Sequence, residues 1–138
     1  MRRLLLAALL GAALPVAVPA DDREYVDLPE MMRAHMLVNM RDHLAALAEA
    51  QEMAAAGQWD RAAEAIEMRL GMTSLESHGA SHMAQFMPPA MREMGTEMHR
   101  AASRLSRLLE EAEPMPVLAG FGELLERCNA CHSAFRIH

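Results

Sequence analysis

The pentapeptide CNACH, residues 128–132, is the part of this chain whose residue types and spacing most clearly indicate chemistry. It contains both cysteines of the protein, Cys128 and Cys131, and His132 follows directly after the second. On a helix, positions three and four residues apart share one face, so both thiols and the imidazole can meet one flat macrocycle. The cysteines would form thioether bonds and the histidine would bind iron. The spacing therefore predicts covalent attachment of one c-type haem.

Two thiols separated by two residues also occur in disulfide or redox pairs and in zinc sites. A zinc site would need more thiolates, or a clear histidine pair. A thioredoxin-like redox pair is expected beside strands. Covalent haem is the interpretation we favour, because it also accounts for the histidine next to the second cysteine.

The first 20 residues have the pattern of a secretory signal peptide. Two arginines precede an apolar run over residues 4–14, and small residues offer cleavage after Ala20. The run is shorter than the about 20 apolar residues that span a bilayer, and an uncleaved membrane anchor is the alternative. We expect export to the periplasm, where c-type haem is attached, and a mature chain, residues 21–138, without a membrane span.

Length and composition narrow the class of protein further. The mature chain is long enough for one domain with one hydrophobic core. The net charge of −6 argues against nucleic acid as a partner, and it favours redox partner proteins with a positively charged docking patch. The sequence has no phosphate-binding loop, nucleophile elbow or convincing carboxylate pair, so we do not expect an enzyme.

The residue types favour helices throughout the mature chain. Alanine, leucine, methionine, glutamate and arginine dominate, whereas valine, isoleucine and aromatic residues are scarce. Proline and glycine positions predict four helices, at residues 29–56, 59–70, 88–113 and 117–135. Pro114 and Pro116 are expected to separate the last two, and residues 72–87 to form a long connection. The expected fold class is all-α, a four-helix bundle.

A helical chain of this size, with CNACH followed by Ser133-Ala134-Phe135-Arg136 near its C-terminal end, resembles the class II cytochromes c. This is the family of cytochrome c′ and its low-spin relatives. The resemblance is strongest over residues 120–136 and weaker over residues 31–50. It implies an antiparallel four-helix bundle with covalently bound haem, held by the last helix and facing the first. It also implies a possible homodimer through the first helix.

The residue opposite His132 on the iron decides which function the resemblance implies. Cytochromes c′ leave this position open under an apolar cover and bind nitric oxide or carbon monoxide. Low-spin relatives fill it with methionine and transfer electrons. Alignment with the first pattern places Leu37 as the cover, and alignment with the second places Met36 as the ligand. Neighbouring helical residues point about 100° apart, so only one can face the iron; we favour Met36 and one-electron transfer.

Other side chains of the first predicted helix could take the place of Met36. Met32 and Met40 lie one turn to either side of it. His35 or His43 would instead give a bis-histidine site of lower potential. A stripe of methionines is also common core packing, and on that interpretation the iron is five-coordinate in a methionine-lined pocket.

Three further residues are expected near the haem. The resemblance places Arg33 beside a propionate, where a guanidinium forms charge-assisted hydrogen bonds. Arg136 occupies the position of the family's usual basic residue after the motif. Phe135 is expected to pack on the haem or on the first helix.

The 14 methionines of the chain support an alternative from another class, a copper-handling protein. Thioethers together with imidazoles are ligands of copper(I). The candidates gather in one stretch: His78, His82, Met83, Met87, Met91, Met94, Met98 and His99. Core packing explains the same methionine pattern more simply, and we expect the loop histidines to be solvated.

Overall fold

The computed structural model describes residues 21–138, and the expected signal peptide, residues 1–20, lies outside the described residues. The described chain is mostly helical, which confirms the predicted helical character. Its four long helices are α1 (Glu30–Ala55), α2 (Trp59–Leu70), α4 (Pro89–Glu111) and α5 (Pro114–Ala134). None of the helices over residues 21–138 combines the length and the apolar character needed to cross a membrane.

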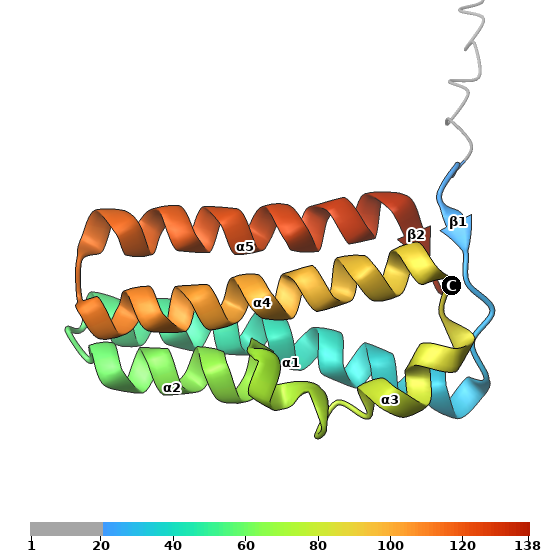
Figure 1. Ribbon diagram of the computed structural model, residues 1–138, viewed down its shortest axis with the longest axis horizontal. Helices are drawn as coiled ribbons and strands as arrows, with labels where there is room; N and C mark the ends of the chain where they lie inside the picture. The colour runs from blue at the N-terminus through green and yellow to red at the C-terminus, as the bar shows by residue number, and fades with distance from the viewer. Residues whose placement is uncertain (1–20) are drawn as a thin grey trace, which may run out of the picture.

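The connection between α2 and α4 has structure of its own. It consists of the 3-10 turn η1 (Met72–Leu75), the short helix α3 (Ala80–Met83) and the 3-10 turn η2 (Ala84–Phe86). Gly79, before α3, adopts a left-handed φ of 62°, which glycine tolerates better than other residues. Because α2 is the shortest of the four, it is present at only one end of the molecule, and the connection takes its place at the other end (Figure 1).

The start of α5 corrects one prediction. Pro114 and Pro116 do not separate two helices, because α5 begins at Pro114. The chain reverses just before it, at Ala112, which has a left-handed φ of 55°. In the first turn of a helix the N–H groups have no intrahelical partner, so proline is tolerated there.

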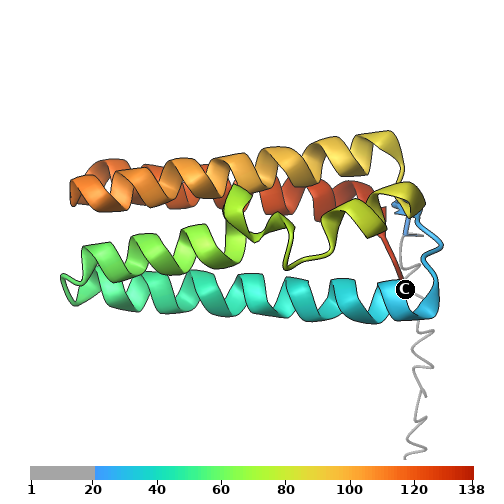
Figure 2. The same ribbon diagram turned by 60° about the horizontal axis from the view of Figure 1, so that its bottom comes forward.

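The long helices pack side by side, each roughly antiparallel to the next along the chain (Figures 1 and 2). α2 packs on α1 and α4, and α4 packs on α5. At the four-helix end they share a core of small and aliphatic side chains with little or no exposure, including Ala50, Ala62, Leu105 and Leu124. We call this the alanine–leucine core.

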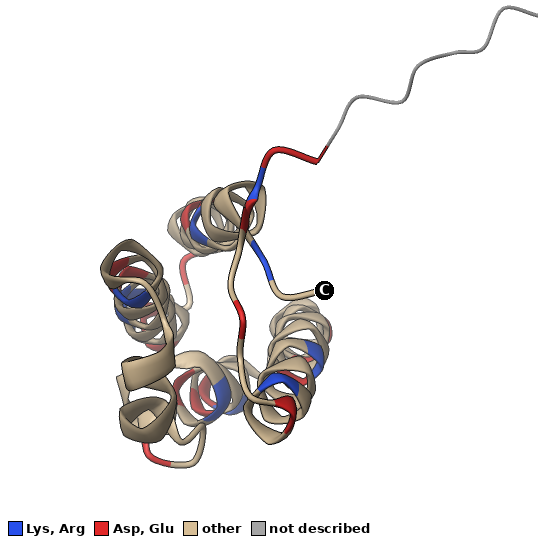
Figure 3. Ribbon diagram, turned by 90° about the vertical axis from the view of Figure 1, so that its right-hand side faces the viewer, with Lys and Arg blue, Asp and Glu red and all other residues tan. Residues whose placement is uncertain are grey.

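The N-terminal segment, residues 21–28, ties the two ends of the described chain together, and we call it the strap. Its strand β1 (Glu24–Tyr25) pairs in parallel with β2 (Phe135–Arg136), directly after α5. Figure 3 shows the strap crossing the end of the helices. This small sheet was not predicted, and Phe135 lies in it rather than in the last helix.

A second apolar cluster joins the strap to the segments that it crosses. It is rich in methionine, and we call it the methionine cluster; its buried members are Val26, Leu28, Met36, Met83, Met91, Phe135 and Ile137. The described chain therefore has two apolar clusters of different composition, one at each end of the long helices.

Candidate functional site

A cavity of about 520 Å³ opens at the strap end of the molecule, and this volume is typical of small-molecule and cofactor sites. Its walls come from α1, the α2–α4 connection, α4, the end of α5 and β2. The start of α1 and the end of α5 lie at this same end because these helices run antiparallel (Figure 1). Its lining includes the following residues predicted to lie near a cofactor: Met36, Leu37, Cys131, His132, Phe135 and Arg136.

Helix α1 presents both candidates for the position opposite His132. Met36 is buried, with 7% of its surface exposed, whereas Leu37 is half-buried. Met40 lies in the same wall one turn later, and Met32 packs on the methionine cluster without being part of the cavity lining. The lining thus brings Met36, Leu37 and Met40 together with the histidine of the motif.

The two cysteines are free thiols on the last turns of α5. Cys131 lines the cavity, and Cys128, one turn earlier, is half-buried against the alanine–leucine core. Burial raises the pKa of both thiols, and the neighbouring Cys128 raises that of Cys131 further. One thiol of the motif therefore lies in the cavity wall and the other lies against the core.

His132 completes the motif at the edge of the cavity. Its side chain is exposed and forms part of the cavity wall. Its backbone carbonyl accepts a hydrogen bond of 3.2 Å from Arg23 Nη1 of the strap. The strap therefore contacts the motif directly.

The cavity wall near the strap carries two arginines. Nε of Arg136 is buried and has no hydrogen-bond partner within the described residues; the nearest carboxylate oxygen, on Asp21, lies 3.7 Å away. Arg23 also lines the cavity and is bonded to Asp21. Buried nitrogens without a partner are uncommon, and a ligand carboxylate would complete this one. The residues present thus fit a group with apolar faces and carboxylate edges, such as haem.

Arg33 is not brought to this position. It is half-buried on α1 and is not among the residues that line the cavity. Sequence reasoning missed Arg23, because its position depends on the pairing of β1 with β2, two strands of two residues each. No local signal in the sequence predicts that pairing.

The residues considered for copper are divided between different surroundings. Met83, Met87, Met91 and Met98 line the cavity, whereas His82 is exposed. Within residues 21–138, no three histidine, cysteine, aspartate or glutamate side chains are grouped so as to hold a metal ion. Copper(I) binding by the methionines stays a prediction, which titration with copper(I) and mass spectrometry would test.

Three buried histidines form the inner wall of the cavity. His43 of α1, His78 of the connection and His99 of α4 are 6%, 8% and 8% exposed. The expectation that the loop histidines are solvated holds for His82 and is wrong for His78, whose carbonyl accepts hydrogen bonds from His35 and Asn39 of α1. Burial lowers the pKa of all three imidazoles, that of His43 to about 4.

No protein-family model, curated protein or solved structure matches the chain. The features of the chain that bear on its function are therefore the CNACH motif and the cavity lined by Cys131 and His132.

Proposed function

We propose that the protein is a periplasmic monohaem c-type cytochrome, an antiparallel four-helix bundle that passes single electrons between partner proteins. One observation carries the proposal. Cys131 and His132 of the CNACH motif line a cavity of about 520 Å³, and Met36 lines the same cavity from a different helix. This combination offers one anchoring thiol, an axial imidazole and a candidate thioether ligand within one pocket, and the second anchor, Cys128, lies one turn earlier on α5.

Each of these residues has a distinct role in the proposal. Cys128 and Cys131 anchor the haem covalently, and His132 and Met36 are its axial ligands. Phe135, buried in β2, packs against it. The bound haem supplies a one-electron couple at iron. A thioether opposite an imidazole raises the potential of that couple, which suits electron transfer.

The arginines near the strap are proposed to pair with the propionates. Arg136 Nε is buried without a hydrogen-bond partner in the described part of the chain, and Arg23 lines the same cavity. We assign this role to them in place of Arg33, which lies outside the lining. A guanidinium offsets the desolvation of a buried carboxylate through charge-assisted hydrogen bonds.

The surface beside the cavity supports a positively charged redox partner. Exposed acidic side chains concentrate on the strap and the start of α1: Asp21, Asp22, Glu24, Asp27 and Glu30 (Figure 3). Opposite charge on a partner would steer it toward this end of the molecule, and added salt would weaken that attraction.

A five-coordinate haem that binds nitric oxide or carbon monoxide is the second candidate. It is favoured by one observation, that Leu37 lines the same cavity as Met36. If Leu37 covers the iron, the thioether of Met36 is core packing and the open position accepts a small gas.

Optical spectra of the purified haem protein, oxidised and reduced, with and without carbon monoxide, separate the two candidates. Electron transfer with Met36 as the ligand predicts a low-spin spectrum that carbon monoxide does not change. The Met36→Ala variant should become high-spin and bind carbon monoxide. Met32→Ala is the matched control, because Met32 belongs to the same helix and packs on the methionine cluster outside the cavity lining.

Two results would contradict the assignment of Met36. A high-spin wild-type spectrum that shifts with carbon monoxide would replace electron transfer by gas binding. A low-spin spectrum that survives in Met36→Ala would move the ligand to another residue of the wall, with Met40 tested next.

A further inference from the structure

The three histidines at the inner wall of the cavity form one contiguous cluster that the proposed function does not use. The ring centroids of His43 and His78 lie 4.8 Å apart, those of His78 and His99 5.5 Å, and those of His43 and His99 5.8 Å. The rings come from three different elements and all line the cavity. They lie in its wall together with His132 and the proposed ligand Met36.

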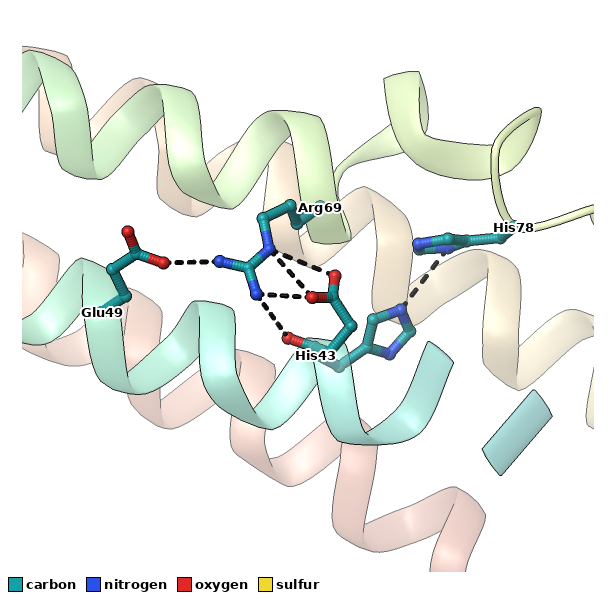
Figure 4. Close-up of polar contacts among 5 residues, drawn as sticks. His43, Glu49, Arg69 and His78 are labelled. Atoms are coloured by element: carbon teal, nitrogen blue, oxygen red, sulfur yellow. Dashed lines mark hydrogen bonds and ion pairs between the residues drawn. The ribbon is translucent and has the colours of Figure 1, made fainter. Parts of the chain in front are cut away.

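Hydrogen bonds indicate where the protons of this cluster lie. Nδ1–H of His99 donates to the carbonyl of Leu70 at 2.7 Å. The hydroxyl of Ser74 donates to the carbonyl of Gly71 at 2.7 Å, so its oxygen is left to accept from Nδ1 of His78 at 3.3 Å. With that proton on His78 Nδ1, the facing atom His43 Nε2, 3.5 Å away, carries a lone pair (Figure 4).

The His43–His78 pair can therefore take up one proton without losing its contact. A proton from solvent binds at His78 Nε2, and the proton of His78 Nδ1 then passes to the facing His43 Nε2. The Nδ1–H bond breaks, an N–H bond forms on His43, and this N–H bridges the two rings. The two neutral imidazoles of His43 and His78 thus become one imidazole and one imidazolium, with one proton taken from solvent.

One group of charges beside the pair attracts an added proton, whereas burial and the neighbouring imidazoles act against it. Asp42, next to His43, is bonded to Arg69 of α2, with Arg69 Nη2 2.5 Å from its Oδ1. Arg69 also pairs with Glu49 at 2.6 Å (Figure 4). Two carboxylates share one guanidinium, which leaves an excess of one negative charge on this side of the cluster.

The other titratable and charged groups around the cluster are neutral or cationic. His35 of α1 is held by its bond to the carbonyl of His78, and His99 is the facing group of α4. Arg92 of α4 lines the cavity, as do Arg23, His132 and Arg136 toward its mouth. The positive charge of these arginines opposes protonation of the cluster, whereas the negative charge on the Asp42 side favours it.

We propose that the His43–His78 pair is a proton-binding site whose occupancy is linked to the one-electron reduction of the cofactor in this cavity. The inference rests on the proposed function. One electron arrives from a donor protein, one proton arrives from solvent at His78 Nε2, and the Nδ1 proton of His78 passes to His43 Nε2. Oxidation by an acceptor protein reverses both steps.

The link follows from electrostatics. An added electron raises the proton affinity of a neighbouring imidazole, more strongly in a cavity than in water. By reciprocity, a bound proton stabilises the reduced state by the same amount. Burial and the neighbouring histidines lower the pKa of His43 to about 4, so a neutral pair is the starting state from which reduction raises the proton affinity.

The test is the reduction potential of the haem protein as a function of pH, from about pH 4, where the oxidised pair titrates, up to about pH 8. Full coupling predicts a potential that falls as pH rises, with a tenfold change in the oxidised-to-reduced ratio per pH unit, ~59 mV for a one-electron couple. His43→Gln should flatten this dependence. His82→Gln, a change of an exposed histidine, should retain it.

A second measurement needs no variant. Reduction of the wild-type protein in unbuffered solution with a pH indicator should remove protons from solvent, up to one for each electron. A wild-type potential independent of pH, no proton uptake, or an unchanged slope in His43→Gln would overturn the inference. Failure of the proposed function would be seen separately, as a purified protein without a haem spectrum.

Discussion

The two ends of the long helices are packed in opposite ways. At the four-helix end, small and aliphatic residues such as Ala50, Ile66 and Leu105 have no exposed surface. At the strap end, α2 has already ended, and methionines and histidines surround a cavity of about 520 Å³.

The difference shows how one short chain can fix its helices rigidly at one end and leave room for a bound group at the other. Alanines and leucines pack in well-defined rotamers and fix the relation between the helices. Methionine is flexible and polarizable, so it adapts to a large group placed against it. α2 is only 12 residues long and does not extend to the strap end. The core at the four-helix end therefore holds together the helices that carry Met36 and the motif, and at the strap end these helices border the cavity.

The largest expected effect is on the strap end. In a Cys128→Ala/Cys131→Ala double variant, all covalently attached haem should be lost, because no other thiol exists in the sequence. Haem staining after denaturing electrophoresis is the measurement. Ser133→Ala changes an exposed neighbour of the motif; it is the control and should stain like the wild type. Haem staining of the double variant would contradict thioether attachment.

At the other end, Leu105→Ala should lower the free energy of unfolding by about 2–5 kcal/mol, because it removes a side chain with no exposed surface from a closed core. Urea denaturation followed by circular dichroism measures this. Leu118→Ala, at an exposed position of α5, should change stability little. Equal losses in the two variants would mean that the alanine–leucine core is not the main source of stability.

The buried histidines should make the protein less stable in acid. Folding lowers the pKa of His43 from 6.5 to about 4, so between these values the unfolded chain binds a proton that the folded chain does not. Stability should therefore fall as pH drops from 6.5 toward 4, by about 3 kcal/mol at most. Thermal unfolding across this range should show a weaker pH dependence in His43→Gln than in His82→Gln.

The smallest effect distinguishes two glycines of α5. An added Cβ at Gly120 would lie 2.9 Å from Leu108 Cδ1 and 3.1 Å from Leu105 Cδ1, whereas at Gly122 it would meet nothing within 4 Å. Gly120→Ala should cost about 1–2 kcal/mol, and Gly122→Ala should stabilise by about 0.5–1 kcal/mol. The reverse order in urea denaturation would contradict the close packing of α4 on α5.

The sequence predicted the helices well where their ends have local signals. Residues 59–70 were predicted as a helix and form α2, and α1 differs from its prediction by one residue at each end. The error at Pro114 arose because proline stops a helix from within but is accepted in its first turn. The sequence alone does not tell which of the two applies.

The sequence predicted only those parts of the candidate site that depend on the motif, the resemblance or helical spacing. The motif predicted Cys131 and His132, and the resemblance singled out Met36 and Leu37, which share the cavity with them. The role of Arg23 and the meeting of His43 with His78 depend on contacts between segments far apart in the chain. Spacing along the sequence carries no information about them.

The central claim is that the strap end holds a covalently bound haem, and the intact mass of the exported protein under denaturing conditions tests it most directly. We predict the mass of residues 21–138 plus one haem, retained after denaturation. The mass of the unmodified chain, or of the chain with a Cys128–Cys131 disulfide, would contradict the account.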